Sequence, residues 1–127
     1  ITGFNNSTIP SDIKIIGDYA FDGCSGLTSI SLPSSLKAIG NSAFRDCSGL
    51  TGELNLGGCT SLTSIGSNAF GYCSALESVV FPEGSTGWEV STSPYMTNPI
   101  SVDVTNPSTN ASNLTGRYCD YYWKRNV

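Results

Sequence analysis

Five cysteines are the residues of this chain best suited to chemistry, and their spacing limits what that chemistry is. They are separated by 23, 12, 14 and 46 residues, and no Cys-x-x-Cys pair occurs, so the spacing fits no zinc pattern. Cys24, Cys47 and Cys73 each follow a Phe by three residues, whereas Cys59 and Cys119 stand outside this pattern. We expect the three to form a ladder of buried thiols in a small apolar slot. Disulfide-bonded pairs are the alternative. If the chain forms stacked coils about 4.8 Å apart, cysteines on neighbouring coils are close enough for a disulfide.

The remaining polar residues do not indicate catalysis. The chain has no histidine, which is the commonest general base near neutral pH and the usual partner of a Ser or Cys nucleophile. Asp18 and Asp22 stand four residues apart, as paired carboxylates on a helix would, but we interpret them as solvated acids on a bend. No G-x-x-x-x-G-K motif occurs, so Gly57-Gly58 is interpreted as a turn. We therefore predict that the chain is not an enzyme and has no catalytic residues, no cofactor and no metal site.

The charge distribution argues against nucleic acid as a partner. Charged residues make up 13% of the chain, about half the usual share of roughly 25%, and the net charge is −4. Residues 1–87 carry seven acids against three cations, and residues 88–127 carry three of each. Nucleic-acid binding needs clustered Lys and Arg, and the sequence contains no such cluster.

Targeting segments are not visible in the sequence. No apolar run approaches the roughly 18–20 residues that a membrane span needs. The first residues carry neither the positive charge nor the apolar stretch of a signal peptide. The chain opens within a repeat, so we expect that part of a longer protein precedes it.

The elements that position these residues come from an internal repeat. Three stretches read I-G-x-x-A-F-x-x-C-S-x-L and begin 23 and then 26 residues apart; they are Ile16–Leu27, Ile39–Leu50 and Ile65–Leu76. A repeat of this length cannot bury its own apolar face, so each unit must stack on its neighbours. We predict a solenoid in residues 1–87. It contains a half-repeat at 9–15 and full units at 16–38, 39–64 and 65–87.

Each unit is expected to contain two extended edges joined by bends. In the first unit, the L-x-x-I-x-L pattern of Leu27–Leu32 predicts a strand with Ile30 and Leu32 pointing inward. Pro33 then turns the chain, because proline cannot extend a strand ladder, and Leu36–Gly40 returns along the opposite edge. A short helical or 3₁₀ turn follows. Its Phe should stack on its counterparts as an aromatic spine, formed by Phe21, Phe44 and Phe70.

The second unit is longer than the first. Between Leu50 and Ile65 lie 14 residues, whereas 11 lie between Leu27 and Ile39. We expect the three additional residues to form a local bulge or a wider turn at Gly57-Gly58, where backbone freedom is greatest.

After Gly87 the repeat pattern stops, and residues 88–127 are predicted to cap the open end of the stack. Ile100–Val104 alternates apolar and polar residues, as an exposed strand does. Asn106–Leu114 predicts a short helix with Pro107 in its first turn, and Tyr118–Trp123 predicts a last strand. Such a cap is needed because a bare end would expose apolar core and strand edges.

The cadence A-F-x-x-C-S-x-L-x-S-I-x-L-P-x-S-L-x-x-I-G, which runs from Ile9 to about Pro82, resembles the BspA-like (Treponema pallidum-type) leucine-rich repeat. The resemblance is carried by Ala20-Phe21, Ala43-Phe44 and Ala69-Phe70, each with Cys three residues after the Phe. With the repeat pattern, it implies a short right-handed leucine-rich-repeat superhelix with parallel strands, short helical or 3₁₀ turns and a small C-terminal α+β cap. It also implies secreted or surface-anchored bacterial proteins that bind host proteins, matrix components or other bacteria. It brings no catalytic residues to carry over.

Our leading prediction is a non-enzymatic surface module for protein recognition or adhesion, acting through the concave strand face. The outward positions that should line up there across coils are Ser29, Ser31, Glu53, Asn55, Ser78 and Val80. This face lacks the Tyr, Trp and Arg anchors that usually dominate affinity, so its binding should be weak per unit area. A merely soluble Ser/Thr ladder is the alternative.

A second candidate surface is the C-terminal aromatic cluster. Tyr121, Tyr122 and Trp123 could stack on the sugars of a glycan or of the cell wall, with packing inside the cap as the alternative. Alternate rings on a strand point to opposite sides, so about half of the cluster should be core. A passive spacer within a larger surface protein is a third interpretation.

Overall fold

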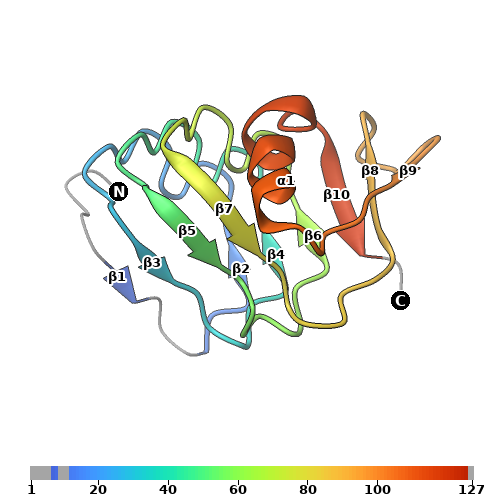
Figure 1. The fold of residues 1–127 in the computed structure, drawn as a ribbon, viewed down its shortest axis with the longest axis horizontal. Coiled ribbons are helices and arrows are strands. Elements are labelled where there is room, and N and C mark those ends of the chain that lie inside the picture. The colour runs from blue at the N-terminus through green and yellow to red at the C-terminus, as the bar shows by residue number, and fades with distance from the viewer. Residues whose placement is uncertain (1–6, 9–11, 126–127) are drawn as a thin grey trace.

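The computed structural model of the chain describes residues 7–8 and 12–125. Successive repeats lie side by side in it, and the segment after Gly87 lies at the end of the stack farthest from β1 (Figure 1). Residues 9–11 of the predicted half-repeat lie outside the described residues.

One edge of the stack is formed by three short parallel strands, one from each Ile-Gly corner. They are β2 (Ile15–Ile16), β4 (Ala38–Ile39) and β6 (Ser64–Ile65). The register pairs Ile16 with Ile39 and Ile39 with Ile65, and all three side chains are buried. The residue before each of them is more exposed, because successive side chains of a strand point to opposite faces.

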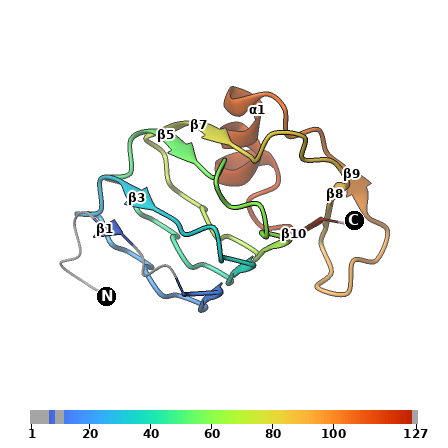
Figure 2. The same ribbon diagram turned by 90° about the horizontal axis from the view of Figure 1, so that it is seen from below.

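A second set of strands forms the opposite edge. β1 (Ser7–Thr8) pairs with β3 (Ile30–Ser31), and β5 (Gly52–Asn55) pairs with β7 (Leu76–Val80), in both cases in parallel. Figure 2 shows the four strands in this order along one side of the molecule. The first edge therefore pairs successive repeats in parallel, as predicted, whereas the second edge consists of two separate parallel pairs, because no strand pairing joins β3 to β5 in the described residues. In the first unit, the partly buried side chains of Ile30 and Leu32 pack against the core.

The phenylalanines of the three repeats stack directly on one another. The ring centroids of Phe21 and Phe44 are 5.1 Å apart with an interplanar angle of 6°, and those of Phe44 and Phe70 are 5.3 Å apart at 1°. All three side chains are buried. The predicted aromatic spine is confirmed, and it fixes the register between coils because each ring must lie over the next.

A polar ladder joins the coils beside this spine. The Asp18 side chain accepts a hydrogen bond from the backbone N–H of Asn41 at 2.8 Å, and the Asn41 side chain accepts one from the N–H of Ser67 at 2.9 Å. These residues directly follow the Ile-Gly pair of each unit. The glycine is required for this approach, since a Cβ on Gly66 would lie 2.4 Å from Oδ1 of Asn41. Asp18 therefore links two neighbouring coils and does not act as one of a carboxylate pair with Asp22.

The longer second unit has a turn at Gly57-Gly58, where the N–H of Gly57 donates to the Asn55 side chain at 2.7 Å. The wider turn is thus where the sequence predicts it. A register shift lies earlier, beside Gly52, whose φ is +70°. Its extra residue is Glu77 on β7, because Gly52 lies opposite Leu76 and Glu53 lies opposite Ser78, so this bulge belongs to the third unit.

The segment after Gly87 continues the first edge with antiparallel strands. β10 (Tyr122–Arg125) pairs with β6 and with β8 (Trp88–Ser91), and β8 pairs with β9 (Ile100–Ser101). Two predicted boundaries are corrected. The strand expected at 100–104 is confined to β9, and the last strand begins at Tyr122 and not at Tyr118. A turn precedes it, closed by a hydrogen bond from the N–H of Tyr121 to the Tyr118 carbonyl.

The predicted helix is α1 (Pro107–Ser112), which continues as a π-helical turn, η1 (Asn113–Arg117). The Asn106 side chain caps it by accepting a hydrogen bond from the N–H of Thr109 at 3.2 Å. Pro107 stands in the first turn as predicted, where its missing N–H leaves no intrahelical bond unmade.

A buried aromatic cluster joins this segment to the repeats. The ring of Phe81 meets Trp88 edge-on at 5.3 Å, and its centroid lies 6.2 Å from that of Trp123. All three are buried, and Trp123 Nε1 donates to the Tyr118 carbonyl at 3.2 Å. The core therefore runs without interruption from the phenylalanine spine into the C-terminal strands.

Candidate functional site

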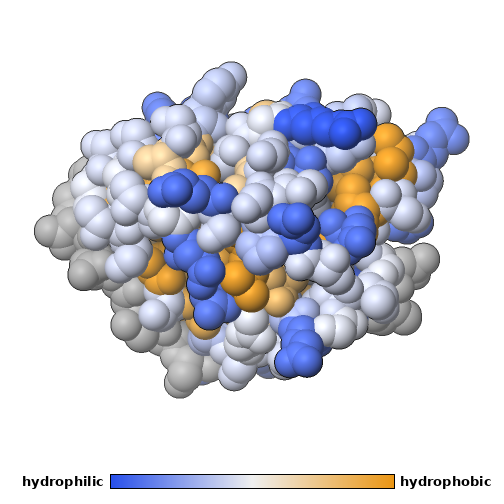
Figure 3. Space-filling view, viewed as in Figure 1, coloured by the Kyte–Doolittle hydropathy of each residue, from blue (hydrophilic) through white to orange (hydrophobic). Residues whose placement is uncertain are grey.

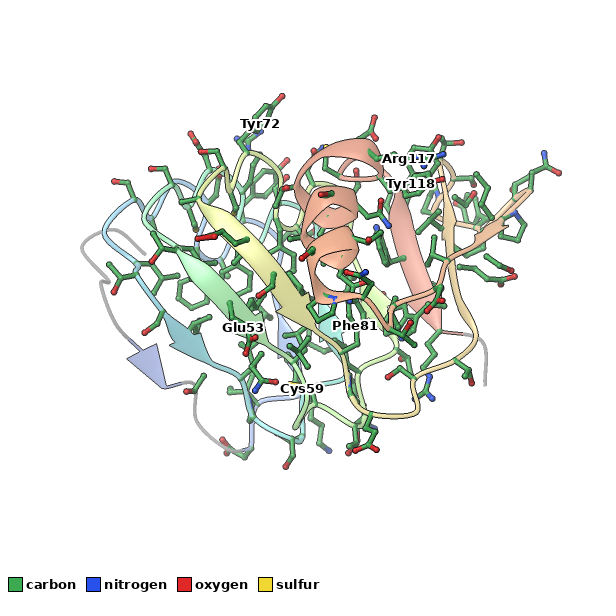
Figure 4. The ribbon with its side chains drawn as sticks, in the orientation of Figure 1. Glu53, Cys59, Tyr72, Phe81, Arg117 and Tyr118 are labelled. Carbon is green, nitrogen blue, oxygen red and sulfur yellow. The ribbon has the colours of Figure 1, made fainter. Side chains whose placement is uncertain are left out.

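The face that carries β3, β5 and β7 brings together the six residues predicted to bind a partner. The register places Glu53 opposite Ser78 and Asn55 opposite Val80. Figures 1 and 2 place β3 beside β5, so Ser29 and Ser31 continue the same surface. The residues contributed by the first two strands are exposed, whereas Ser78 and Val80 are half-buried. The predicted residues thus share one face, and Glu53 is labelled on it in Figure 4.

This face combines apolar surface with negative charge. Figure 3 shows apolar side chains at the surface between polar ones on this side of the molecule. Residues 47–87 carry three acids, Glu53, Glu77 and Glu83, and neither Lys nor Arg. The three glutamates are exposed. The face can therefore attract cationic groups, each with modest energy because the acids are solvated.

The outer edge of β7 is closed by α1. Asn110, on α1, is fully buried, and its Nδ2 donates to the carbonyls of Val79 and Val104, each at 2.8 Å. The helix thus supplies hydrogen-bond donors where a further repeat would supply a strand. It also forms a wall at one end of the strand face.

A pocket of about 200 Å³ lies below α1, next to the end of β7. It is formed by the end of β7 with the turn that follows, and by the start of α1 with the residues before it. Its lining residues are Val80, Phe81, Pro82, Glu83, Gly84, Ser85, Val104, Thr105 and Pro107. Figure 4 shows Phe81 at this position, below α1. Sequence reasoning misses the pocket, because two segments that are distant in the sequence, 80–85 and 104–107, combine to make it.

Parallel strands in register and a stacked Phe in every unit are features of a leucine-rich repeat, and comparison with known families agrees. The family described as the BspA type leucine-rich repeat region matches residues 2–114 in six copies. The chain belongs to the BspA-type leucine-rich repeat family. The resemblance seen in the sequence is therefore confirmed.

A solved structure shares this BspA-type fold. The crystal structure of the T. pallidum leucine-rich repeat protein (TpLRR) is 34% identical to this chain, with a TM-score of 0.57. The match covers 64% of this chain and 39% of that one, so the chain spans well under half of that protein's length. A search of the curated proteins found no match.

Leucine-rich repeat families are generally non-enzymatic scaffolds that mediate protein–protein interactions, and BspA-like members are associated with bacterial surfaces. No helix in the described part of the chain is long and apolar enough to cross a membrane. Within the same residues, no three His, Cys, Asp or Glu side chains gather as metal ligands would.

The cysteines of the BspA-type repeat pack the core. Sγ of Cys47 donates to the Phe21 carbonyl at 3.1 Å, and Sγ of Cys73 donates to the Phe44 carbonyl at 3.0 Å, so each thiol bonds to the preceding coil. The neighbouring Cys73 thiol and burial raise the pKa of Cys47, which disfavours the reactive thiolate. All five cysteines are thiols in this structure, in agreement with the predicted ladder and not with oxidised pairs.

The two cysteines outside the repeat pattern also have structural positions. Cys59 is buried in the widened turn of the second unit, where its Sγ donates to the Pro33 carbonyl at 3.5 Å and burial raises its pKa. Cys119 lies beside the third unit, and its carbonyl accepts a hydrogen bond from the N–H of Asn68 at 2.6 Å. Cys59 therefore joins two neighbouring coils, and Cys119 joins the segment after Gly87 to the third unit.

The C-terminal aromatic residues do not form one surface. Trp123 is only 1% exposed and lies against Phe81, so its ring cannot stack on a sugar. Its place in the predicted glycan site is wrong, because the alternation of side chains along β10 turns it into the core. Tyr121 and Tyr122 are half-buried, and Tyr121 packs edge-on against Tyr118 at 4.9 Å.

Sequence reasoning also misses the most exposed aromatic side chains. Tyr19, Tyr72 and Tyr95 are 59%, 68% and 89% exposed. Tyr19 and Tyr72 have φ values of 60° and 62°, and Tyr72 lies on the upper edge in Figure 4. Arg45, whose Nε lies 3.0 Å from Oδ1 of Asp22, also lies over the Tyr19 ring. The available signal is that tyrosine occupies repeat positions where the other units have Gly, Ser, Asn or Asp.

Proposed function

We propose that this chain is a protein-recognition module of a larger bacterial surface or secreted protein, and that it contributes to adhesion. The observation that carries the proposal is the exposed face built by β3, β5 and β7, on which Glu53 and Asn55 of one repeat lie in register with Ser78 and Val80 of the next. Repetition gives such a face a regular spacing that suits a partner's surface better than a small molecule.

The proposal includes the organisation of the chain. We infer that the repeats end near residue 87, that residues 88–127 form the cap, and that the coils follow the right-handed path usual for parallel connections. Members of the family act at bacterial surfaces, and TpLRR is the longer protein, so further repeats would extend the same face.

The face itself indicates moderate affinity. Its exposed residues are Ser, Glu and Asn, whereas interface hot spots are enriched in Trp, Tyr and Arg. A large contact area summed over several repeats therefore supports binding better than any single residue of this face. Binding should then fall when a bulky charge is placed at its centre.

A biosensor assay tests the proposal. The chain is passed over immobilised laminin, fibronectin and collagen, with serum albumin as the negative surface. The double variant Ser31→Arg and Asn55→Arg places two bulky side chains on the face, and we expect it to weaken binding about tenfold or more, because the surfaces can no longer close. Ser48→Arg, on an exposed turn away from the strands, is the matched control and should bind as the parent does. Absence of saturable binding to all three proteins would remove the proposal.

A further inference from the structure

The pocket below α1 has the size and lining of a site for one side chain. Its volume of about 200 Å³ is below the roughly 300–1,000 Å³ of small-molecule sites. Phe81, Pro82, Val104 and Pro107 give it an apolar surface. Val80 belongs both to this pocket and to the strand face, so a chain lying on the face would reach the pocket directly.

The rim of the pocket is acidic. Glu83 is the one charged residue among those that line it, and its side chain is exposed. Asp103 stands next to the lining residues Val104 and Thr105. Its Oδ1 accepts hydrogen bonds from Thr105 Oγ1 at 2.7 Å and from the Thr105 N–H at 2.9 Å, and these bonds lower its pKa. Asp103 is therefore ionised at neutral pH.

One cation lies near the rim. The Nε of Arg125 donates to the carbonyl of Thr86 at 2.9 Å, one residue beyond the lining. The described part of the chain contains no ion pair to Glu83 within salt-bridge distance. The acidic rim is thus open to a cation from outside.

The spacing of these groups matches an extended chain. Glu53 precedes Asn55 by two residues, and Asn55 lies opposite Val80, which places Glu53 about 8 Å from Val80 by strand geometry. In an extended segment, residues two apart lie on one side and are about 6.8 Å apart. A segment with its apolar side chain in the pocket can therefore direct a Lys or Arg, two residues away, toward Glu53 or Glu83.

We propose that the pocket binds an apolar side chain from an extended segment of a partner protein, and that Glu53 and Glu83 bind Lys or Arg residues two positions from it. This proposal rests on the proposed function of the strand face and names the chemistry of its partner. The negative charge of the face excludes acidic segments, and the apolar pocket excludes purely polar ones.

The test uses the whole chain and three synthetic peptides. The probe is a fluorescein-labelled nine-residue peptide of Ser and Gly with Leu at its centre and Lys two residues to either side. In one control peptide Ser replaces Leu, and in the other Glu replaces both Lys. By fluorescence anisotropy we expect the probe to bind about tenfold or more tightly than the Ser control, since burial of one Leu side chain is worth that factor. It should also bind more tightly than the Glu control, whose carboxylates are repelled by Glu53 and Glu83. Equal binding of the three peptides, or no binding of the probe at about 1 mM, overturns the proposal.

Variants of the chain locate the site. Val80→Lys places a cation at the mouth of the pocket and should abolish probe binding, while Glu83→Gln should weaken it a few-fold, as expected for one exposed ion pair. Thr97→Lys and Asp46→Asn carry matched charge changes at exposed positions outside the pocket and should leave binding unchanged. Circular dichroism confirms that each variant is folded, and Glu83→Gln keeps the test valid if Val80→Lys unfolds. Probe binding that is insensitive to both pocket variants overturns the proposal.

The two proposals fail in different ways. Binding of matrix proteins that is lost in the Ser31→Arg and Asn55→Arg variant but kept in full in Glu83→Gln, which lies outside the strand face, supports the strand face and overturns the pocket. If no matrix protein binds although the probe peptide binds through Val80 and Glu83, the adhesion proposal falls and the pocket stands.

Discussion

At the scale of single residues, the thiols show how a reactive group is used for packing. Each repeat thiol that donates to a phenylalanine carbonyl satisfies a backbone group of the preceding coil while filling apolar space. Burial raises the pKa of Cys59 above its ordinary value of 9.0. The folded state therefore favours the neutral thiol of Cys59. As a result, the free energy of unfolding depends on pH in the alkaline range.

The first prediction concerns this linkage. Because the folded pKa of Cys59 is raised, its contribution to stability is complete below the ordinary pKa and is lost as pH rises through the folded pKa. The free energy of unfolding should fall above about pH 9, by at most about 1.4 kcal/mol per pH unit for each such thiol. Urea unfolding between pH 7 and pH 10.5 measures it. Cys59→Ala should be less stable at pH 7 but show a shallower decline, and equal slopes would contradict the assignment.

At the scale of elements, the corner between the strand and the turn decides how closely coils approach. The glycine after each Ile allows the Asp or Asn side chain of one coil to reach the backbone of the next. A Cβ on Gly66 would lie 2.4 Å from Asn41 Oδ1 and 2.5 Å from the Asn41 backbone nitrogen. Backbone atoms cannot rotate away as a side chain can, so the coils themselves would have to separate.

The second prediction follows from this geometry. Gly66→Ala should destabilise the chain by about 1–3 kcal/mol, because overpacking at a rigid contact forces the backbone to shift. The midpoint of urea unfolding measures the change. Gly58→Ala is the matched control, since a Cβ there meets nothing within 4 Å. If both variants unfold at the same urea concentration, close approach at the corner is not what requires glycine.

At the scale of the whole molecule, the segment after Gly87 and the stacked units before it share one continuous core. β10 pairs with β6 of the third unit, α1 bonds to β7 through Asn110, and Trp88 and Trp123 pack on Phe81. Each contact couples a repeat to the C-terminal segment. Since a stack of repeats is held mainly by nearest-neighbour contacts, these junction contacts decide whether it unfolds as a unit.

The third prediction tests this coupling. Asn110→Ala removes two buried hydrogen bonds and should lower the free energy of unfolding by about 2–4 kcal/mol, because two carbonyls lose their donors. Tryptophan fluorescence reports on the junction and far-UV circular dichroism on the whole chain. Both transitions should shift together in this variant and remain coincident. Ser112→Ala, exposed on the same helix, should change neither. Separate transitions would show that the cap and the repeats are independent.

Much of the repeat architecture is readable from spacing alone. Phe, Cys and Ile recur at fixed positions, and units that cannot bury these side chains by themselves must stack, so the aromatic spine and the parallel pairing follow from local pattern. The bulge opposite Gly52 is not readable in this way, because only the pairing of β5 with β7 decides that Glu77 has no opposing residue.

The candidate site also has features that the sequence determines and features that it does not. The sequence by itself determined which residues point outward from the strands, because alternation along a strand is a local property: Glu53 and Asn55 stand on the face where they were predicted. Only the tertiary structure decided that Trp123 is core, that Asn110 closes the edge of β7, and that Glu83 and Val104 meet at one pocket. These outcomes depend on contacts between segments far apart in the chain, and no local pattern encodes which segments meet.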